Sequence, residues 1–92
     1  MPAVLQFNRE AISERFDAAA AYLGIEGGFD GFCNYVDQLN ASMGIPKTLT
    51  KLGVDNPDVD RLVKDALNDP STGGNPVEMT AENTKTLLLA CL

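Results

Sequence analysis

The stretch GIPKTLTKLGV, residues 44–54, divides the chain into two pairs of predicted helices. Gly44 ends the helix before it, because glycine readily adopts the left-handed conformation that closes a helix. Pro46 then prevents the helix from continuing. Residues 46–52 are too few for a full helix, so we expect one or two turns, partly 3-10 in character, ended by Gly53. A new helix is predicted after this connection.

Two amphipathic helices are predicted before residue 44. The first begins at the capping residue Asn8 and ends at Gly24, and the second runs from Phe29 to Met43. Residues 1–7 are apolar and carry no helix-start signal of their own. Apolar residues at helical spacing predict the buried sides: Ile12, Phe16, Ala19 and Leu23 in the first helix, and Phe29, Phe32, Cys33, Val36, Leu39 and Met43 in the second.

Two more helices are predicted after residue 54. Asn56 is expected to cap the first of them, with Pro57 at its first helical position, and Asp69-Pro70 to end it. Thr80 is expected to cap the last helix. The predicted apolar sides are Val59, Leu62, Val63, Ala66 and Leu67, and then Thr84, Leu87, Leu88 and Cys91. No alternating strand pattern is present, so we predict an all-α fold of four to five helices, packed as one compact bundle-like domain over residues 1–92.

The composition is that of a water-soluble globular chain. Of the 92 residues, 45% are hydrophobic and 22% charged, and no apolar run is long enough to span a bilayer. The net charge of −6 repels nucleic-acid backbones and anionic lipid surfaces. We therefore expect neither nucleic acid nor membrane as a partner, and a cytoplasmic location.

The lack of histidine limits the chemistry of the chain most strongly. Without histidine there is no Ser-His-Asp or Cys-His arrangement and no imidazole ligand for a metal. Cys33 and Cys91 have no closely spaced second sulfur ligand, and their positions on apolar helix sides predict buried free thiols. From the residues alone, we expect no self-sufficient active site.

Residues 71–79, STGGNPVEM, are predicted to form a surface loop between the last two helices. The two glycines, Asn75 and Pro76 are typical turn residues. The lysine and hydroxyl residue that follow a phosphate-binding loop are missing, and no strand precedes the glycines. Either a plain surface turn or a loop that offers backbone N–H groups to a ligand remains possible on this pattern.

Four segments together resemble the C-terminal part of the iron-dependent (group III) alcohol dehydrogenases. In this sequence they are PAVLQFN (2–8), GIPKTLTKLGV (44–54), ALNDPSTGGNP (66–76) and TAENTKTLLLACL (80–92). They occur in the order and at the spacing of the family and extend over nearly the whole chain. The resemblance implies the C-terminal helical part of the dehydroquinate synthase-like fold, in which a helical domain packs against an N-terminal nucleotide-binding domain.

The resemblance also implies a reaction and its cofactors. Family members transfer a hydride between an alcohol and NAD(P), with iron or another divalent metal in the cleft. Their metal is held by one aspartate and three histidines, which all precede the segment matched by residues 2–8. No metal ligand, catalytic residue or cofactor-binding residue can therefore be assigned to this chain. We expect it to be a C-terminal fragment that is not catalytic alone.

One loop of this chain carries a site expectation from the resemblance. The segment matched by residues 71–76 approaches the catalytic cleft in family members, and Ser71 lies where several of them have cysteine. We therefore expect Ser71, Thr72, Gly73 and Gly74 to line the substrate cleft of a complete enzyme. Asn75 and Pro76 are interpreted as fixing the entry to the last helix.

A second hypothesis treats the chain as a stand-alone helical interaction module. A helical domain separated from its partner exposes an apolar surface, and self-association covers it. The expected partners are thus either an N-terminal dehydrogenase domain or a second copy of the chain in a homo-dimer.

Overall fold

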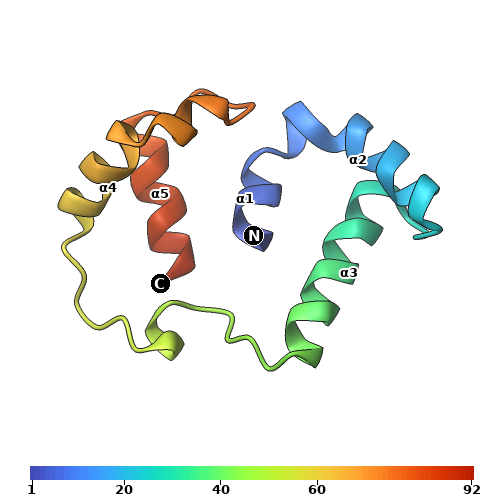
Figure 1. The fold of residues 1–92 in the computed structure, drawn as a ribbon, viewed down its shortest axis with the longest axis horizontal. Coiled ribbons are helices and arrows are strands. Elements are labelled where there is room, and N and C mark those ends of the chain that lie inside the picture. Colours follow the sequence, from blue (N-terminus) through green and yellow to red (C-terminus); the bar gives the residue numbers. More distant parts are fainter. The chain divides into compact units, whose positions relative to one another are not determined.

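The computed structural model describes residues 1–92 and contains only helices, turns and irregular segments (Figure 1). The all-α prediction is therefore confirmed. The α-helices are α1 (Pro2–Phe7), α2 (Arg9–Leu23), α3 (Gly28–Ser42), α4 (Val59–Asn68) and α5 (Ala81–Cys91), and the 3-10 helices are η1 (Thr50–Leu52) and η2 (Pro70–Gly74). None of them combines the length and the apolar character needed to cross a bilayer.

The chain divides into two compact units, residues 1–45 and 46–92. The first contains α1, α2 and α3, and the second contains η1, α4, η2 and α5. A single domain over residues 1–92 stays a prediction.

The first unit is built on the packing of α2 and α1 against α3. Its core consists of Leu5, Ile12, Phe29, Cys33 and Val36, with Phe16 and Phe32 packed against it. The Phe16 ring meets Phe32 edge-on at a centroid distance of 4.9 Å and Phe29 at 6.1 Å. Burying one such aromatic side chain stabilises a fold by about 1.5–3 kcal/mol, so this cluster is the main apolar contribution in the unit.

The connection between α2 and α3 is held by polar contacts as well. A carboxylate oxygen of Asp17 accepts a hydrogen bond of 2.7 Å from the Phe29 backbone N–H at the start of α3. The Arg9 guanidinium binds both carboxylate oxygens of Asp30, at 2.8 and 2.9 Å, and lies 4.9 Å from the centre of the Phe29 ring. Together these contacts fix the first turn of α3 against α2.

The glycine helix ends were predicted correctly. Gly24 and Gly44 both have left-handed backbone angles, with φ of 71° and 68°. The residue after each folds back, since the Ile25 N–H donates to the carbonyl of Ala20 and the Ile45 N–H to that of Asn40. Gly53 ends η1 in the same conformation.

The predicted buried sides are correct at some positions and wrong at others. In α2, Leu23 is 59% exposed, whereas Ala20, outside the predicted stripe, is fully buried. In α3, Leu39 is 43% and Met43 57% exposed, although Phe29, Cys33 and Val36 are buried as predicted. In α4, Leu62 is 41% exposed, although the neighbouring Val63 is buried as predicted.

Three local predictions need correction. Residues 2–7, predicted to lack a helix start, form α1 with Pro2 in its first turn. The helix after residue 54 begins at Val59 and is capped by Asp58, whose carboxylate accepts from the Arg61 N–H; Asn56 instead adopts a left-handed φ of 46°. Residues 70–74, predicted as loop apart from Pro70, form η2.

In the second unit, α4 packs against α5 and η2 packs against α4 (Figure 1). Val63 and Thr84 are buried between these elements. Thr80 caps α5 as predicted, through a reciprocal pair of hydrogen bonds in which the Asn83 N–H donates to the Thr80 hydroxyl and the Thr80 N–H donates to the Asn83 side chain. At the other end of α5, the Leu49 N–H donates to the carbonyl of Cys91 at 2.8 Å, and the Thr50 hydroxyl to that of Leu92 at 2.7 Å.

Candidate functional site

The four residues predicted to line a cleft lie together in η2, between α4 and α5. Asp69 starts this short helix, because one of its carboxylate oxygens accepts a hydrogen bond of 2.7 Å from the Ser71 N–H. That backbone hydrogen bond, together with one from the Ser71 side chain, lowers the pKa of Asp69 below its usual value. The Thr72 hydroxyl donates to the carbonyl of Ala66 at 2.5 Å and ties η2 to the end of α4.

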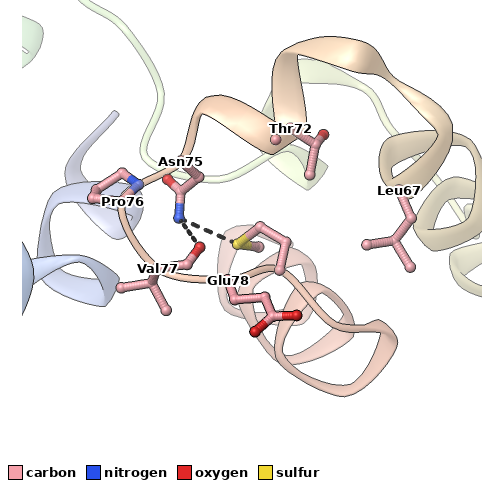
Figure 2. A pocket seen from close by; sticks show the side chains of 8 residues that line it. Leu67, Thr72, Asn75, Pro76, Val77 and Glu78 are labelled. Atoms are coloured by element: carbon pink, nitrogen blue, oxygen red, sulfur yellow. Dashed lines mark hydrogen bonds between the residues drawn. The ribbon is translucent and has the colours of Figure 1, made fainter.

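A hollow of about 440 Å³ lies beside η2 (Figure 2). Thr72 and Gly73 belong to its lining, whereas Ser71 and Gly74 do not. The structure thus brings two of the four predicted residues to one concave surface. The full lining consists of Leu67, Thr72, Gly73, Asn75, Pro76, Val77, Glu78 and Met79.

The lining residues beyond η2 were missed as site candidates. Asn75 was interpreted only as a turn residue, yet its side-chain amide donates to the carbonyl of Val77 at 2.8 Å and to the Met79 sulfur at 3.3 Å (Figure 2). An asparagine between two glycines and a proline is a common turn pattern. That pattern contains no sign of the sulfur contact, which depends on how the chain returns to α5.

The hollow offers hydrogen-bonding and apolar surfaces but no reactive group of its own. Its polar side chains are a hydroxyl, an amide and a carboxylate, and its apolar side chains include Leu67 and Val77. Such a lining can orient a small molecule that has one polar end.

The two cysteines lie outside this hollow and are free thiols. Cys33 is buried in the core of the first unit, and burial raises the pKa of its thiol, with the charge of Asp30 adding to the effect. The Cys33 thiol is therefore protonated and inert near neutral pH. Cys91 is half-buried in the last turn of α5, so the prediction of burial holds fully for Cys33 alone.

A second hollow, of about 520 Å³, lies between α4 and α5. Val63, Leu67 and Ala81 contribute apolar surface to it. An ion pair of 2.7 Å joins Lys85 and Asp60, two of its lining residues. Its lining contains no cluster of side chains suited to catalysis or metal binding.

The comparison with protein families matches the whole chain. The sequence model described as "Fe-containing alcohol dehydrogenase family, C-terminal" covers residues 1–92. This chain belongs to the Fe-containing alcohol dehydrogenase family and corresponds to its C-terminal part.

Individual relatives agree with this assignment. The chain is 32% identical over 90 residues to lactaldehyde reductase of Escherichia coli (strain K12), a stretch that covers 90% of the chain and 24% of that protein. It is 30% identical over 94 residues to the NADPH-dependent butanol dehydrogenase of Clostridium saccharobutylicum, with 92% and 24% covered. The bifunctional aldehyde-alcohol dehydrogenase of Escherichia coli (strain K12) is 31% identical over 95 residues, with 91% and 11% covered. The chain thus spans about a quarter or less of the length of these relatives.

The side chains of this chain do not fit the iron that the family name implies. Histidine is absent, and no group of three or more cysteine, aspartate or glutamate side chains is arranged to hold a metal ion. The donor atoms around the candidate hollow include a single carboxylate, which is too few for a metal site.

Proposed function

We propose that this chain supplies the C-terminal helical part of a metal-dependent, NAD(P)-linked alcohol dehydrogenase. The match of the family's C-terminal model to residues 1–92 carries the proposal. In the complete enzyme a hydride passes between a small alcohol and the nicotinamide ring. The relatives named for lactaldehyde and butanol support a small substrate.

Within that enzyme, the chain contributes a wall of the substrate cleft. Ser71, Thr72, Gly73 and Gly74 in η2 form this wall, and the hollow beside Thr72 and Gly73 supports this placement. The metal ligands and the nucleotide-binding residues belong to an N-terminal dehydrogenase domain, which is the proposed partner. The lack of a metal-binding side-chain group in residues 1–92 supports this division of roles.

The proposal predicts that the chain is inactive alone and active when completed. The purified chain, verified by mass, is mixed with NADH or NADPH, Fe²⁺ or Zn²⁺ and lactaldehyde or butanal, and nicotinamide absorbance is followed. We expect no turnover above a metal-free, cofactor-free control. Co-production with the N-terminal portion of lactaldehyde reductase is expected to give metal-dependent turnover. Activity of the chain alone would contradict the proposal, and so would a folded but inactive assembly.

The matches to dehydrogenases favour this function over a stand-alone interaction module that forms homo-oligomers. Light scattering over a concentration series separates the two proposals. A chain that stays monomeric alone, but elutes with the N-terminal portion when both are produced, is the result expected for the dehydrogenase.

A further inference from the structure

Asn75 contacts both walls of the candidate hollow. On one side, its backbone N–H donates to the carbonyl of Thr72 at 3.1 Å, within the wall formed by η2. On the other side, its side-chain amide reaches the Val77 carbonyl at 2.8 Å and the Met79 sulfur at 3.3 Å (Figure 2). One residue therefore joins the end of η2 to the segment that returns toward α5.

The first turn of α5 has a cap of its own. Thr80 and Asn83 form their own reciprocal cap, with distances of 2.8 and 3.2 Å. The Asn83 amide also donates to the carbonyl of Glu78 at 2.9 Å. The Asn75 amide acts on residues 77–79, the segment that leads from η2 into α5.

We propose that Asn75 is a positioning residue of the substrate cleft, whose side-chain amide holds the Val77–Met79 segment at a set distance from Thr72 and Gly73. The inference rests on the proposed function, since the hollow becomes part of a substrate cleft only in the complete enzyme. Asn75 contacts the backbone and a thioether, so its effect on substrate is exerted through the shape of the hollow.

The first test uses the full chain and amide hydrogen exchange. Asn75→Asp keeps the shape of the side chain but replaces the donating amide with a carboxylate, which can only accept. We expect the backbone N–H of residue 75, which donates to the Thr72 carbonyl, to exchange about fivefold faster in the variant. A factor of this size corresponds to the loss of one net hydrogen bond. The amides of α5, such as that of Thr84, should exchange at the original rate.

Two further variants serve as controls. Asn83→Ala is expected to show the reverse pattern, with faster exchange in the first turn of α5 and an unchanged amide at residue 75. Asn34→Asp introduces the same charge at an exposed position in the middle of α3 and should change neither region. Unchanged exchange at residue 75 in Asn75→Asp, or faster exchange confined to α5, would overturn the positioning role.

The second test separates positioning from stability in the assembled enzyme. With the chain co-produced with the N-terminal portion of lactaldehyde reductase, Asn75→Asp should raise KM for the small substrate about fivefold and change kcat less. Asn34→Asp, at an exposed position of α3 that is not part of the hollow, should leave KM unchanged. An unaltered KM in an active Asn75→Asp assembly would overturn the inference. An inactive wild-type assembly would contradict both the proposed function and the role of Asn75 in a substrate cleft. The hydrogen-exchange result would still show whether Asn75 positions the residues around the hollow.

Discussion

At the scale of single residues, the buried hydroxyl of Thr84 lowers the stability of the folded chain. The residue is only 8% exposed, and its hydroxyl has no hydrogen-bond partner. A buried hydroxyl without a partner has lost its contact with water and gained nothing in exchange. We predict that Thr84→Val, which replaces the hydroxyl with a methyl group of similar size, stabilises the chain by about 1 kcal/mol in urea unfolding.

Thr86 provides the matched control on the same helix. It is exposed, and its hydroxyl donates to the Glu82 carbonyl at 3.0 Å. Thr86→Val removes a satisfied group, so its effect should be within about 0.5 kcal/mol. Equal effects of the two substitutions would show that the Thr84 hydroxyl has a partner in solution.

The Arg9–Asp30 ion pair predicts a pH dependence. The hydrogen bond from Arg9, aided by its charge, holds the pKa of Asp30 below the ordinary value of 3.8. A carboxyl group whose pKa is lower in the folded state stabilises the fold above its unfolded pKa. This stabilisation is therefore complete at pH values above about 3.8, the ordinary pKa. It is lost as the pH falls through the lower pKa that Asp30 has in the folded chain.

Asp30→Asn tests this dependence. Thermal unfolding should show a lower midpoint for the variant near neutral pH, and the difference from the wild type should shrink in acid below the folded pKa of Asp30. Added salt should also reduce the difference, because both side chains are exposed. Asp37→Asn, at an exposed position on the same helix, should show a smaller effect at neutral pH. If the difference in unfolding midpoint between the wild type and Asp30→Asn grew as the pH fell, the predicted direction of the pH dependence would be wrong.

At the scale of elements, the close approach of α3 to the turn before it depends on Gly31. A Cβ at this position would overlap the backbone oxygen of Glu26. Alanine is favoured over glycine in a helix by up to about 1 kcal/mol, but the overlap involves backbone that can move only if the turn moves. We predict that Gly31→Ala destabilises the chain by about 1–3 kcal/mol, measured by urea unfolding.

Gly73→Ala provides the comparison. A Cβ at Gly73 would meet open space, and its backbone has no positive φ. Alanine there should be neutral or stabilising by up to about 1 kcal/mol, because it restricts the unfolded chain. If Gly31→Ala proved as mild as Gly73→Ala, the contact between α3 and Glu26 would be looser in solution than in the structure.

Helix ends were predictable from the sequence where their cause is local. Gly24, Gly44 and Thr80 were assigned correctly, because a left-handed glycine or a capping hydroxyl acts within a few residues. The start of α4 was placed too early, because Asn56 and Asp58 are both good caps and nothing local chooses between them. The structure selects Asp58.

The parts that could not be predicted depend on contacts between distant residues. Helix α1 lacks a polar cap, and Leu5 is buried in the core with Phe29 and Cys33 of α3. In the candidate site, Thr72 and Gly73 followed from the family resemblance, whereas Leu67 and Met79 reach the hollow only through the packing of α4, η2 and α5.

At the scale of the whole molecule, the division at residue 45 predicts where a protease acts first. Residues 46–49 contain no helix, and the side chain of Lys47 is exposed. The other lysines and arginines lie in helices, which must unfold locally before cleavage. Limited trypsin digestion should therefore cut first after Lys47 and release pieces 1–47 and 48–92, identified by mass.

Lys47→Gln removes this site and should delay the first cleavage. The remaining early products should then come from Lys51 in the short helix η1. A first cut inside α2 or α4 in the wild-type chain would show that these helices open more readily than the connection.

The hydrogen bonds from Leu49 and Thr50 to the carbonyls of Cys91 and Leu92 have a consequence for protein engineering. They bring residues 49–50, near the start of the second unit, next to residues 91–92. A segment whose ends meet can be spliced into a surface loop of another protein with little strain on the host. Residues 48–92 are thus suited to transplantation as a cassette, with α4, η2 and the candidate hollow at a distance from both splice points in the sequence.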